Sequence, residues 1–597
     1  MAHGAVFESN PKWFQQLILF RLSNYLKKYK KEYIYGFLAL LLASVMAAAV
    51  PYFLKYPIDI LKDVGPNDTF FLSIGPFLLA ALFSGICLYF TRLILIGISR
   101  KIEYDLRNDY FAHLQKLSPA FYHRRRIGDI MARGTNDINA VRSLLGPGIM
   151  YSLQTIVYTT LAVVVMVQID FKLTLLALAP FPIIAVSVNR LVKRMYRISD
   201  KVQSLFSDVT TKVEENFSGI RVVKAYRLEE KQIGYFNEVN QSYLKSNLKL
   251  SLLRGVLFAG ITLLAGLGFV VVLYFGGRDV IFQRITLGEF VSFNTYLISL
   301  MWPMISIGWV INLFQMGAAS FARIEKIMDE EPEIKDSVDT DHSIKSISGS
   351  IKFRNISFKY GAAGQNVLSD VNFEIDEGMY VAVVGTTGSG KSTLVNLIGR
   401  LHDAQEGKVL LGDYEINRIP LKVLRAKVGF VPQEDFLFSD SIAANIAFGD
   451  GKYDPAELRR IAECVQIAPE IEAFSDQYDT LLGERGINLS GGQKQRISIA
   501  RAALRRPKIL ILDDSLSAVD TVTERKILNN LKSQFAECTK IIVSHRVTTL
   551  TDADLTLVLR DGRIIETGTH PELLAQDGFY ADLYHKQLIQ EELESIA

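Results

Sequence analysis

The chain has 597 residues, of which 49% are hydrophobic and 22% are charged, and its formal net charge at pH 7 is +3. Soluble globular proteins carry about 25% charged residues in domains of roughly 100–200 residues, so more than one domain is expected, with an unusually apolar part. The small net charge, without a basic tract interleaved with aromatic residues, excludes nucleic acid as an expected partner.

The chain contains three cysteines, Cys87, Cys464 and Cys538. They lie far apart in the sequence, without a C-x-x-C pair and without the spacing of metal ligands. Neither a disulfide framework nor a zinc site is therefore expected, and a reducing compartment fits the polar half of the chain.

The N-terminal residues 11–28 alternate aromatic, apolar and basic side chains. This pattern is typical either of a helix that lies in the membrane interface or of an ordinary surface helix. The first long apolar run starts only after the basic cluster at residues 27–31 and is too long for a cleavable signal, so we expect it to remain as a membrane anchor. We assign residues 1–32 to an N-terminal cytosolic segment with an elbow helix.

Six apolar segments follow, each near the ~20 residues that a helix needs to cross the hydrocarbon layer. They span residues 33–56, 70–98, 147–169, 173–192, 255–275 and 287–314. The polar connections after the second and the fourth segment keep a helical periodicity. We therefore expect a transmembrane domain over residues 33–328, with helices that extend into the cytosol and end in turns that can contact another domain.

Basic residues predict the orientation of these segments. Lys and Arg concentrate at the N-terminus and in residues 100–142 and 190–254, whereas the short loop 59–68 is mostly acidic. Because cytoplasmic loops carry the excess of Lys and Arg, both termini are expected in the cytosol.

A second domain is expected over residues 349–597, after an acidic and polar linker at residues 329–348. Its main motif is Gly385-Thr386-Thr387-Gly388-Ser389-Gly390-Lys391-Ser392-Thr393, which fits G-x-x-x-x-G-K-[ST]. The apolar residues 380–384 before it suit a buried strand, and residues 394–398 after it suit a helix. This strand-loop-helix context favours a phosphate-binding loop over the alternative, a glycine turn with a surface lysine.

The residue types of the motif explain how it would bind a nucleotide. Glycines let backbone N–H groups and the helix N-terminus approach phosphates closely. Lys391 would neutralise the β- and γ-phosphates, and Ser392 would place its hydroxyl on Mg²⁺. The predicted fold class is a polytopic α-helical membrane domain followed by an α/β P-loop NTPase domain.

Beyond this loop the chain supplies Gln433, then Leu489-Ser490-Gly491-Gly492-Gln493, then Ile509-Leu510-Ile511-Leu512-Asp513, and then His545. In this order these motifs resemble the nucleotide-binding domain of ABC transporters. The resemblance implies ATP and Mg²⁺ as cofactors, with Tyr360 stacked on adenine and Gln433 sensing Mg²⁺ and the γ-phosphate. It also implies that Asp513 holds Mg²⁺ through water, that His545 is catalytic, and that Ser517-Ala518-Val519-Asp520 form the D-loop.

The membrane half is similar to type IV-fold ABC exporters, often called type I exporters. Residues 117–122 with Gly128-Asp129, and residues 214–216 with 219–224, look like their intracellular loops. The resemblance implies half a transporter, with six transmembrane helices and one nucleotide domain. Its partner would be a second half-transporter, and the signature residues 489–493 of each chain would contact the nucleotide held by the other.

Asp514 departs from the family pattern. Hydrolysing members usually carry glutamate after the Walker B aspartate, as a base toward water, and here the pair is Asp513-Asp514. Aspartate is one methylene shorter, and misplacing a catalytic group by roughly 1 Å can cost about 10²-fold in rate. The pattern resembles the subunit of heterodimeric exporters that carries a slow, degenerate ATP site. The alternative is a homodimer in which Asp514 serves adequately, and the retained His545 and signature are compatible with it.

The expected substrate is hydrophobic or amphipathic, such as a drug-like compound, a lipid or a peptide. Aromatic and Met side chains recur in the apolar segments, where they would line an adaptable pocket or serve packing and interfacial anchoring. The resemblance implies an integral, multi-pass protein of a bacterial inner membrane in contact with membrane lipids. An ATP-gated channel or regulator remains an alternative, although no added regulatory segment is evident.

Overall fold

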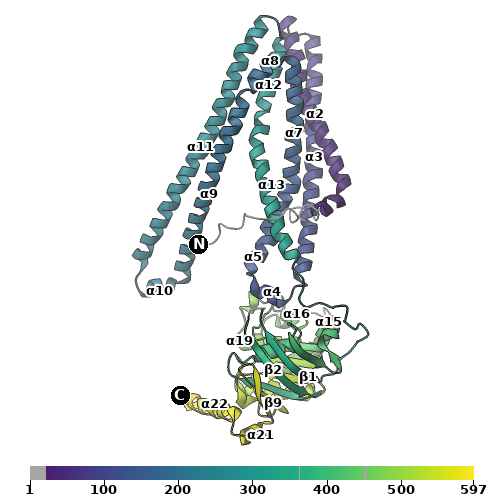
Figure 1. The fold of residues 1–597 in the computed structure, drawn as a ribbon, viewed down its shortest axis with the longest axis vertical. Coiled ribbons are helices and arrows are strands. Elements are labelled where there is room, and N and C mark those ends of the chain that lie inside the picture. Colours follow the sequence, from purple (N-terminus) through teal and green to yellow (C-terminus); the bar gives the residue numbers. More distant parts are fainter. Residues whose placement is uncertain (1–21, 362–363, 449–452, 597) are drawn as a thin grey trace. The chain divides into compact units, whose positions relative to one another are not determined.

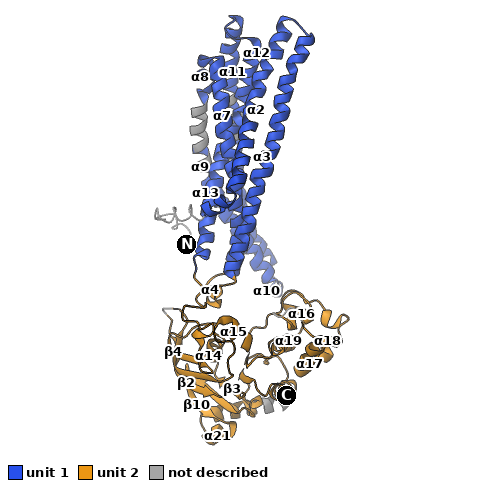
Figure 2. Cartoon of the chain, turned by 90° about the vertical axis from the view of Figure 1, so that its right-hand side faces the viewer, with its two compact units in different colours: residues 1–114, 127–330 blue, residues 115–126, 331–597 orange. Residues whose placement is uncertain are grey.

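The structure is a computed structural model that describes residues 22–361, 364–448 and 453–596. The chain divides into two compact units, which Figure 2 colours separately. The first comprises residues 1–114 and 127–330, and the second comprises residues 115–126 and 331–597. Of the predicted N-terminal helix, residues 11–21 lie outside the described residues, and residues 22–28 are helical.

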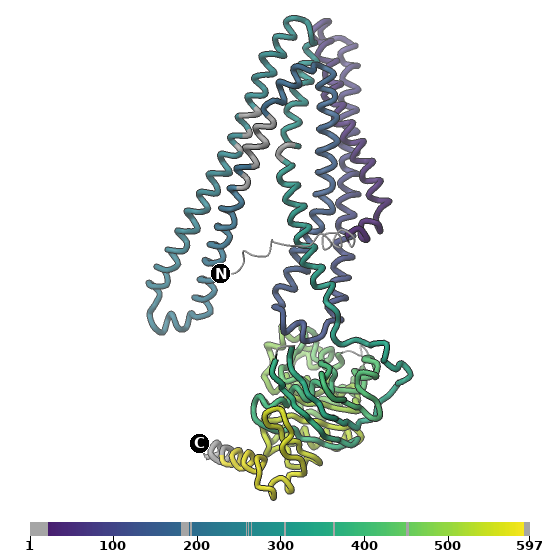
Figure 3. Tube along the Cα trace, viewed as in Figure 1, coloured from purple at the N-terminus to yellow at the C-terminus, as the bar shows by residue number. Residues whose placement is uncertain are grey.

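The first unit is helical. Its long helices are α2 (Lys30–Asp63), α3 (Asp68–Leu114), α7 (Ile149–Ile169), α9 (Pro180–Ser218), α11 (Glu229–Ile281), α12 (Leu287–Ser299) and α13 (Met301–Met328). Shorter segments are α5 (Ile127–Ala132), α6 (Ile138–Ser143), α8 (Phe171–Leu178) and α10 (Ile220–Ala225). In Figures 1 and 3, α9 and α11 form a hairpin closed by α10, while α2, α3, α7 and α13 run alongside one another.

Four helical stretches in the described part of the chain are long and apolar enough to cross a membrane: Lys30–Asp63, Asp68–Leu114, Ile127–Ile169 and Leu287–Met328. They contain the first, second, third and sixth predicted segments. The fifth lies within α11, and the fourth is divided between α8 and α9. The division falls at Pro180, which lacks the backbone N–H that a continuous helical ladder requires.

Polar contacts join the end of α2 to the start of α12. The Asp59 carboxylate accepts hydrogen bonds from the Thr286 hydroxyl and from the Gly288 N–H, both at 2.7 Å. Thr286 is also the N-cap of α12 and forms a capping box with Glu289. A Cβ at Gly288 would lie 2.1 Å from the Lys55 carbonyl oxygen, so only glycine permits this approach of the two helices.

The second unit contains two β-sheets. The larger sheet has the strand order β10-β9-β3-β8-β7-β6, with β6, β7, β8, β3 and β9 parallel and β10 antiparallel. These strands are β3 (Tyr380–Gly385), β6 (Val428–Val431), β7 (Ile509–Asp513), β8 (Thr539–Val543), β9 (Leu555–Arg560) and β10 (Arg563–Gly568). The smaller, antiparallel sheet has the order β2-β1-β4-β5, formed by β1 (Ile351–Lys359), β2 (Asn366–Ile375), β4 (Glu406–Leu411) and β5 (Tyr414–Glu415).

One face of the larger sheet packs against helices, and the other packs against further helices and the smaller sheet, so its inner strands are buried on both faces and are continuous apolar runs. The helices are α14 (Lys391–Ile398), α15 (Leu421–Lys427), α16 (Ile442–Ile446), α17 (Pro455–Cys464), α18 (Ala468–Glu472), α19 (Gly491–Leu504), α20 (Thr521–Gln534), α21 (His570–Ala575) and α22 (Phe579–Ile596). Alternate residues of one strand enter different cores, as Leu510 and Leu512 of β7 pack on one side and Ile511 on the other. The strand-loop-helix prediction around residues 380–398 is confirmed.

The short helix α4 (Pro119–Arg124) belongs to the second unit, although its neighbours in the sequence belong to the first. Phe121 is only 2% exposed. The Arg124 guanidinium and the Glu333 carboxylate form an ion pair of 2.6 Å, and the Ser118 hydroxyl donates to Glu333 at 3.2 Å. By contrast, none of the residues of α10, all of which the structure describes, is buried.

Candidate functional site

The phosphate-binding motif forms the loop between β3 and α14. Its last glycine, Gly390, is the N-cap of α14 and has a left-handed backbone with φ of 101°. A Cβ there would lie 2.9 Å from Leu368 Cδ2 and 3.0 Å from the Val367 carbonyl oxygen, so glycine is required for both conformation and space. The loop therefore presents backbone N–H groups and a helix N-terminus, a combination that favours anions.

Lys391 is buried at the start of α14, with 5% of its surface exposed. Its ammonium group donates hydrogen bonds of 2.9 Å to the carbonyl oxygens of Gly385 and Thr386. Burial lowers its pKa, while the nearby carboxylates of Asp514 and Asp513 oppose that shift. The cation is thus already removed from bulk water, which strengthens its attraction for an entering anion.

A cavity of about 200 Å³ brings together most of the predicted catalytic and phosphate-contacting residues. It is lined by Val367, Thr387, Gly388, Gly390, Lys391, Ser392, Thr393, Gln433, Asp513, Asp514, Val543 and His545. The motif residues Gly385, Thr386 and Ser389 are not among them. Apart from Val367 of β2, these residues lie at or just after the carboxyl ends of β3, β6, β7 and β8, where open α/β sheets bind ligands.

Asp513 and Ser392 contact each other inside this cavity. The Ser392 hydroxyl donates a hydrogen bond of 3.0 Å to Asp513 Oδ1. Burial raises the pKa of Asp513, and Asp514 adds to the rise, whereas the hydrogen bond from Ser392 and the charge of Lys391 lower it. A hydroxyl and a carboxylate side by side are the oxygen ligands that Mg²⁺ prefers.

Asp514 has a left-handed backbone with φ of 48°, and its N–H donates to the Val543 carbonyl oxygen at 2.9 Å. Aspartate enters this conformation more readily than most residues with a Cβ. The Asp514 carbonyl oxygen in turn accepts a hydrogen bond of 3.0 Å from the Ser517 hydroxyl. The backbone turn at Asp514 therefore fixes where its short side chain enters the cavity.

His545 lines the same cavity from the segment after β8. Burial lowers its pKa, and the positive charge of Lys391 lowers it further, while the Asp514 carboxylate opposes the shift; the net shift favours the neutral ring. The side chain of Gln587 in α22 donates to the His545 carbonyl oxygen and accepts from the Val547 N–H at 2.7 Å. The last helix of the domain thus fixes the backbone on both sides of Arg546.

The signature residues lie outside this cavity, at the N-terminus of α19. Ser490 is the N-cap and shares a capping box with Gln493: the Ser490 N–H donates to Gln493 Oε1 at 2.8 Å, and the Gln493 N–H donates to the Ser490 hydroxyl at 3.3 Å. Of the described residues that line the cavity, none comes from Leu489, Ser490, Gly491, Gly492 or Gln493. The signature residues therefore do not share a cavity with the chain's own phosphate loop.

Two residues that sequence reasoning missed hold the predicted D-loop. Gln495 accepts a hydrogen bond of 2.9 Å from the Ala518 N–H and donates at 3.1 Å to the Ser517 hydroxyl. Arg546 donates to the Val519 and Ser517 carbonyl oxygens at 2.9 and 3.1 Å. The only sequence signal for either was proximity, since Gln495 follows the signature and Arg546 follows His545.

The last D-loop residue and the start of α20 complete this network. Asp520 is the N-cap of α20 and accepts from the Thr523 N–H at 2.9 Å. Glu524 of α20 is buried and forms an ion pair of 3.0 Å with Arg546.

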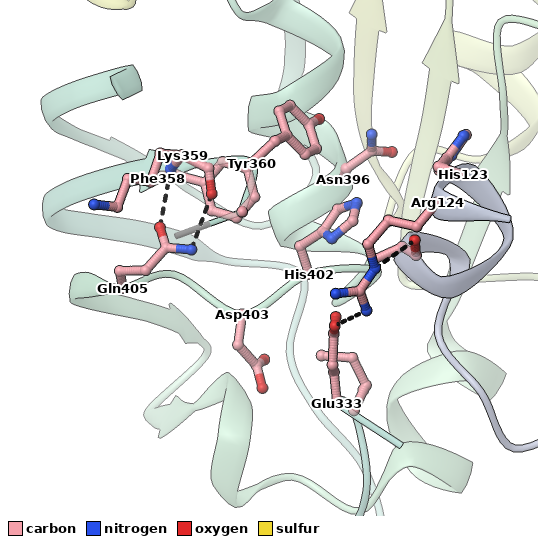
Figure 4. Close-up of a pocket in the computed structure, with 13 residues that line it drawn as sticks. His123, Arg124, Glu333, Phe358, Lys359, Tyr360, Asn396, His402, Asp403 and Gln405 are labelled. Atoms are coloured by element: carbon pink, nitrogen blue, oxygen red, sulfur yellow. Dashed lines mark hydrogen bonds and ion pairs between the residues drawn. The ribbon is translucent and has the colours of Figure 1, made fainter. Parts of the chain in front are cut away.

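Tyr360 lies apart from the small cavity and lines a larger one of about 830 Å³. Its hydroxyl is 3.1 Å from the Thr393 hydroxyl, which ties it to the end of the phosphate loop. The Tyr360 side chain is 47% exposed, so its ring is available to a ligand. Figure 4 shows the residues around this second cavity.

Known families match both halves of the chain. Residues 33–304 match the ABC transporter transmembrane region, and residues 368–517 match the ABC transporter family of ATP-binding domains. A solved structure of a bacterial Atm1-family ABC exporter with ATP bound superimposes with a TM-score of 0.77 and 27% identity, covering 94% of this chain and 98% of that chain.

Named relatives extend over the same length. The chain is 35% identical to the probable multidrug resistance ABC transporter ATP-binding/permease protein YheI of Bacillus subtilis, over 96% of this chain and 97% of the relative. It is 33% identical to the multidrug resistance-like ATP-binding protein MdlA of Escherichia coli, over 96% and 97%. It is 32% identical to the ATP-dependent lipid A-core flippase of Desulfotalea psychrophila, over 96% and 99%. The predicted fold class is confirmed, and the chain belongs to the ABC exporters, as a membrane-spanning protein that joins a transmembrane region to an ATP-binding domain.

Proposed function

We propose that this chain is one half of a dimeric exporter that moves hydrophobic or amphipathic substrates across a bacterial inner membrane, with both termini in the cytosol. The partner in this proposal is a different half-transporter, and the ATP site on this chain hydrolyses slowly. The observation that carries the proposal is the Asp513-Asp514 pair at the end of β7, which lines the cavity together with Lys391, Ser392 and His545. The names of relatives, which include multidrug resistance proteins and a lipid A-core flippase, support this substrate class.

The phosphate loop fits the phosphates of a nucleoside triphosphate. Lys391 is a desolvated cation, and the Ser389 hydroxyl oxygen is buried without a hydrogen-bond partner in the described part of the chain. An entering phosphate would supply acceptors to both groups and to the N–H groups at the start of α14. Tyr360, exposed beside Thr393, would stack on the adenine ring.

The same cavity fits Mg²⁺. Ser392 and Asp513 offer a hydroxyl and a carboxylate in mutual contact, and Gln433 adds a side-chain amide oxygen. In this proposal Ser392 and Gln433 would hold the ion directly, and Asp513 would hold it through water. The ion supplies charge neutralisation at the β- and γ-phosphates when it is bound.

Asp514 and His545 would contact the attacking water, Asp514 as its general base and His545 as a hydrogen-bond partner. A general base contributes about 10² to 10⁴ in rate when it reaches the proton it removes. The Asp514 carboxylate stands one methylene short of a glutamate carboxylate, while its backbone is fixed by the hydrogen bond to Val543. His545, neutral through burial, can accept a hydrogen bond there. We therefore expect this site to bind ATP and to hydrolyse it slowly.

The signature is the part of this chain that we assign to the partner's nucleotide. Ser490 and the residues at the start of α19 do not line the chain's own cavity. The first N–H groups of a helix have no carbonyl partner within the helix, so the start of α19 would suit a phosphate held by another chain. In a heterodimer, this intact signature completes the partner's fast site.

The homodimer is the second candidate, favoured by the complete set of Gln433, His545 and signature residues. The deciding experiment measures the steady-state ATPase rate of purified wild type and Asp514→Asn, each alone and co-expressed with a candidate partner that carries glutamate at this position. The heterodimer predicts weak activity alone and strong activity in the complex, with little effect of Asp514→Asn. Robust activity of this chain alone that Asp514→Asn removes would establish the homodimer.

A further inference from the structure

The cavity of about 830 Å³ in the second unit is lined by α4, by the segment before β1, by the end of β1 and by the loop after α14. Its walls carry charged, aromatic and amide side chains: His123, Arg124, Glu333, Phe358, Lys359, Tyr360, Asn396, His402, Asp403 and Gln405. In Figure 4 the His402 ring lies in the middle of this group, between Tyr360 on one side and Arg124 and Glu333 on the other. His402 has no role in the site described above.

Three rings pack together at this place. The centroids of Phe358 and Tyr360 are 4.9 Å apart with planes at 89°, and those of Tyr360 and His402 are 5.3 Å apart at 88°. The Phe358 and His402 centroids are 5.6 Å apart. Edge-to-face pairs at such distances are attractive because the ring edge is positive and the face negative. Tyr360 is therefore restrained at its hydroxyl by Thr393 and at its ring by Phe358 and His402.

The position of His402 at the cavity wall implies that removing its ring would leave Tyr360 less restrained. Phe358 is buried and fixed in β1, whereas His402 stands at the cavity wall with open volume beyond it. Because His402 lines this cavity, truncation of its side chain would enlarge the cavity and remove one of the two rings that pack on Tyr360. The exposed Tyr360 ring would then sample orientations that cannot stack on a base.

His402 is also suited to this role by its charge state. Burial lowers its pKa, which the charge of His123 lowers further, while the carboxylates of Glu333 and Asp403 oppose the shift. Arg124 engages Glu333 in an ion pair of 2.6 Å, which leaves Glu333 partly neutralised toward His402. The net downward shift favours the neutral imidazole, which packs against two aromatic rings without the cost of desolvating a charge.

We propose that His402 is a positioning residue for the adenine contact, which holds the Tyr360 ring in the orientation that receives the base. The proposal rests on the proposed role of Tyr360 as the residue that stacks on adenine. It predicts that His402 affects recognition of the base and leaves recognition of the phosphates unchanged, because Lys391 and the phosphate loop do not depend on the ring cluster.

The test compares two probes, Mg·ATP and Mg·tripolyphosphate, which share the phosphates and differ in the base. Dissociation constants are measured on the full chain in nanodiscs for wild type, His402→Ala, His402→Phe and Tyr360→Ala. We expect His402→Ala to weaken ATP about 2- to 10-fold, the range for loss of an aromatic pair, and to leave tripolyphosphate unchanged. His402→Phe should restore ATP binding to within about twofold, since it restores a ring. In the ATPase activity of this chain alone, which depends on its own ATP site, the KM for ATP should rise with little change in kcat.

A matched control is His570→Ala, since His570 also packs edge-on against two rings, those of Tyr580 and Tyr584, in another part of the same unit. It should leave the ratio of the two dissociation constants at the wild-type value. Tyr360→Ala separates the two proposals. If it weakens ATP selectively while His402→Ala binds ATP like wild type, or loses both probes equally, the positioning role is wrong and the role of Tyr360 stands. If Tyr360→Ala itself binds ATP like wild type, the assignment of Tyr360 is wrong and the positioning role fails with it.

Discussion

The ammonium group of Lys391 lies 2.9 Å from the carbonyl oxygen of Gly385, so the phosphate loop holds its own lysine through a backbone hydrogen bond. We expect Lys391→Ala to weaken ATP binding at this chain's site about 10- to 100-fold, because hydrogen bonds to charged groups are worth about 1.5–3 kcal/mol. The measurement is equilibrium binding of Mg·ATP. Lys352→Ala, which removes a half-buried lysine of β1 paired with Glu374, is the control and should bind ATP normally. Equal affinity of Lys391→Ala and wild type would contradict the assignment.

Ser490 and Asp514 should behave oppositely in a heterodimer. Ser490→Ala in this chain should stop most ATP turnover of the complex, because the signature completes the partner's fast site. Asp514→Asn should leave most turnover, since little hydrolysis depends on its short carboxylate. The ATPase rate of each co-expressed complex is the measurement. In a homodimer, Asp514→Asn would instead lower turnover by about 10²-fold or more, as expected for losing a general base.

Phe121 of α4 is buried in the second unit, and we expect it to transmit nucleotide-driven movement to the membrane helices. Phe121→Asp places a charge at this buried position and should abolish substrate transport in vesicles while ATP binding stays within about twofold of wild type. Phe121→Leu, which keeps the apolar contact, is the matched control and should retain transport. Thermal unfolding must first show that the Asp variant folds. Transport at the wild-type rate by Phe121→Asp would refute the role of α4.

Gly219 is the residue between α9 and α10, and its N–H donates to the Glu215 carbonyl oxygen at 2.9 Å. Gly219→Pro removes this donor and should distort the turn that presents α10, whose exposed residues we expect to dock on a nucleotide domain. We expect uncoupling, with ATP binding retained and transport lost, measured as substrate accumulated per ATP hydrolysed. Gly219→Ala keeps the N–H and serves as the milder comparison. An unchanged ratio in the Pro variant would argue against a coupling role.

Gly288 and Asp59 should stabilise the first unit. Gly288→Ala inserts a Cβ where the Lys55 carbonyl oxygen would be 2.1 Å away, and overpacking of this kind costs about 1–3 kcal/mol. Asp59→Ala removes two acceptors from the start of α12 and should cost about 1–2 kcal/mol. The midpoint of thermal unfolding in a fixed lipid or detergent is the measurement. Gly277→Ala, at a position with open space around the added Cβ, is the control and should unfold like wild type.

Glu457 should make the second unit sensitive to acid. The hydrogen bond from Arg460 is the largest cause that lowers the pKa of Glu457, to about 2, with Arg506 acting the same way and burial opposing both. A carboxylate whose folded-state pKa lies below its unfolded value of about 4.3 stabilises the protein above that pH. This stability is lost as the pH falls from about 4.3 to 2, and it amounts to about 1 kcal/mol after solvent screening.

The measurement for Glu457 is the difference in unfolding free energy between wild type and Glu457→Gln at pH 7 and at pH 3. Wild type should be the more stable protein at pH 7, and the difference should shrink at pH 3. Glu537→Gln is the control, because Glu537 is 92% exposed and pairs only loosely with Lys508 at 3.7 Å. A difference that stays constant with pH would show that Glu457 does not titrate as described.

Much of the fold could be predicted because its signals are local. The glycines and the lysine of residues 385–393 are required by the backbone conformation and charge of a phosphate-binding loop in any protein. The length of an apolar run is enough to predict a membrane-spanning segment. The split of the fourth apolar segment at Pro180 also has a local cause. It was not predicted, because a hydropathy average over the segment does not show where proline interrupts a helix.

The contacts that hold the site together are not local, and the sequence could not reveal them. Gln495, Arg546 and Gln587 orient backbone groups of the D-loop and of His545 through hydrogen bonds that arise only when α19, β8 and α22 pack on one sheet. A glutamine or arginine in a helix or loop is most often a solvated side chain. His402 is similar, because its relation to Tyr360 exists only once β1 and the loop after α14 meet.

Gln587 connects helix α22 to the backbone around His545, which lines the smaller cavity. Its side-chain amide is hydrogen-bonded to both backbone groups that flank Arg546. A fusion protein or affinity tag that pulls on α22 would therefore act on His545 without touching the nucleotide. The position of a tag should therefore affect the measured rate of ATP hydrolysis. A chain truncated within α22 before residue 587 lacks both hydrogen bonds of Gln587, and its hydrolysis rate should differ from that of the full chain.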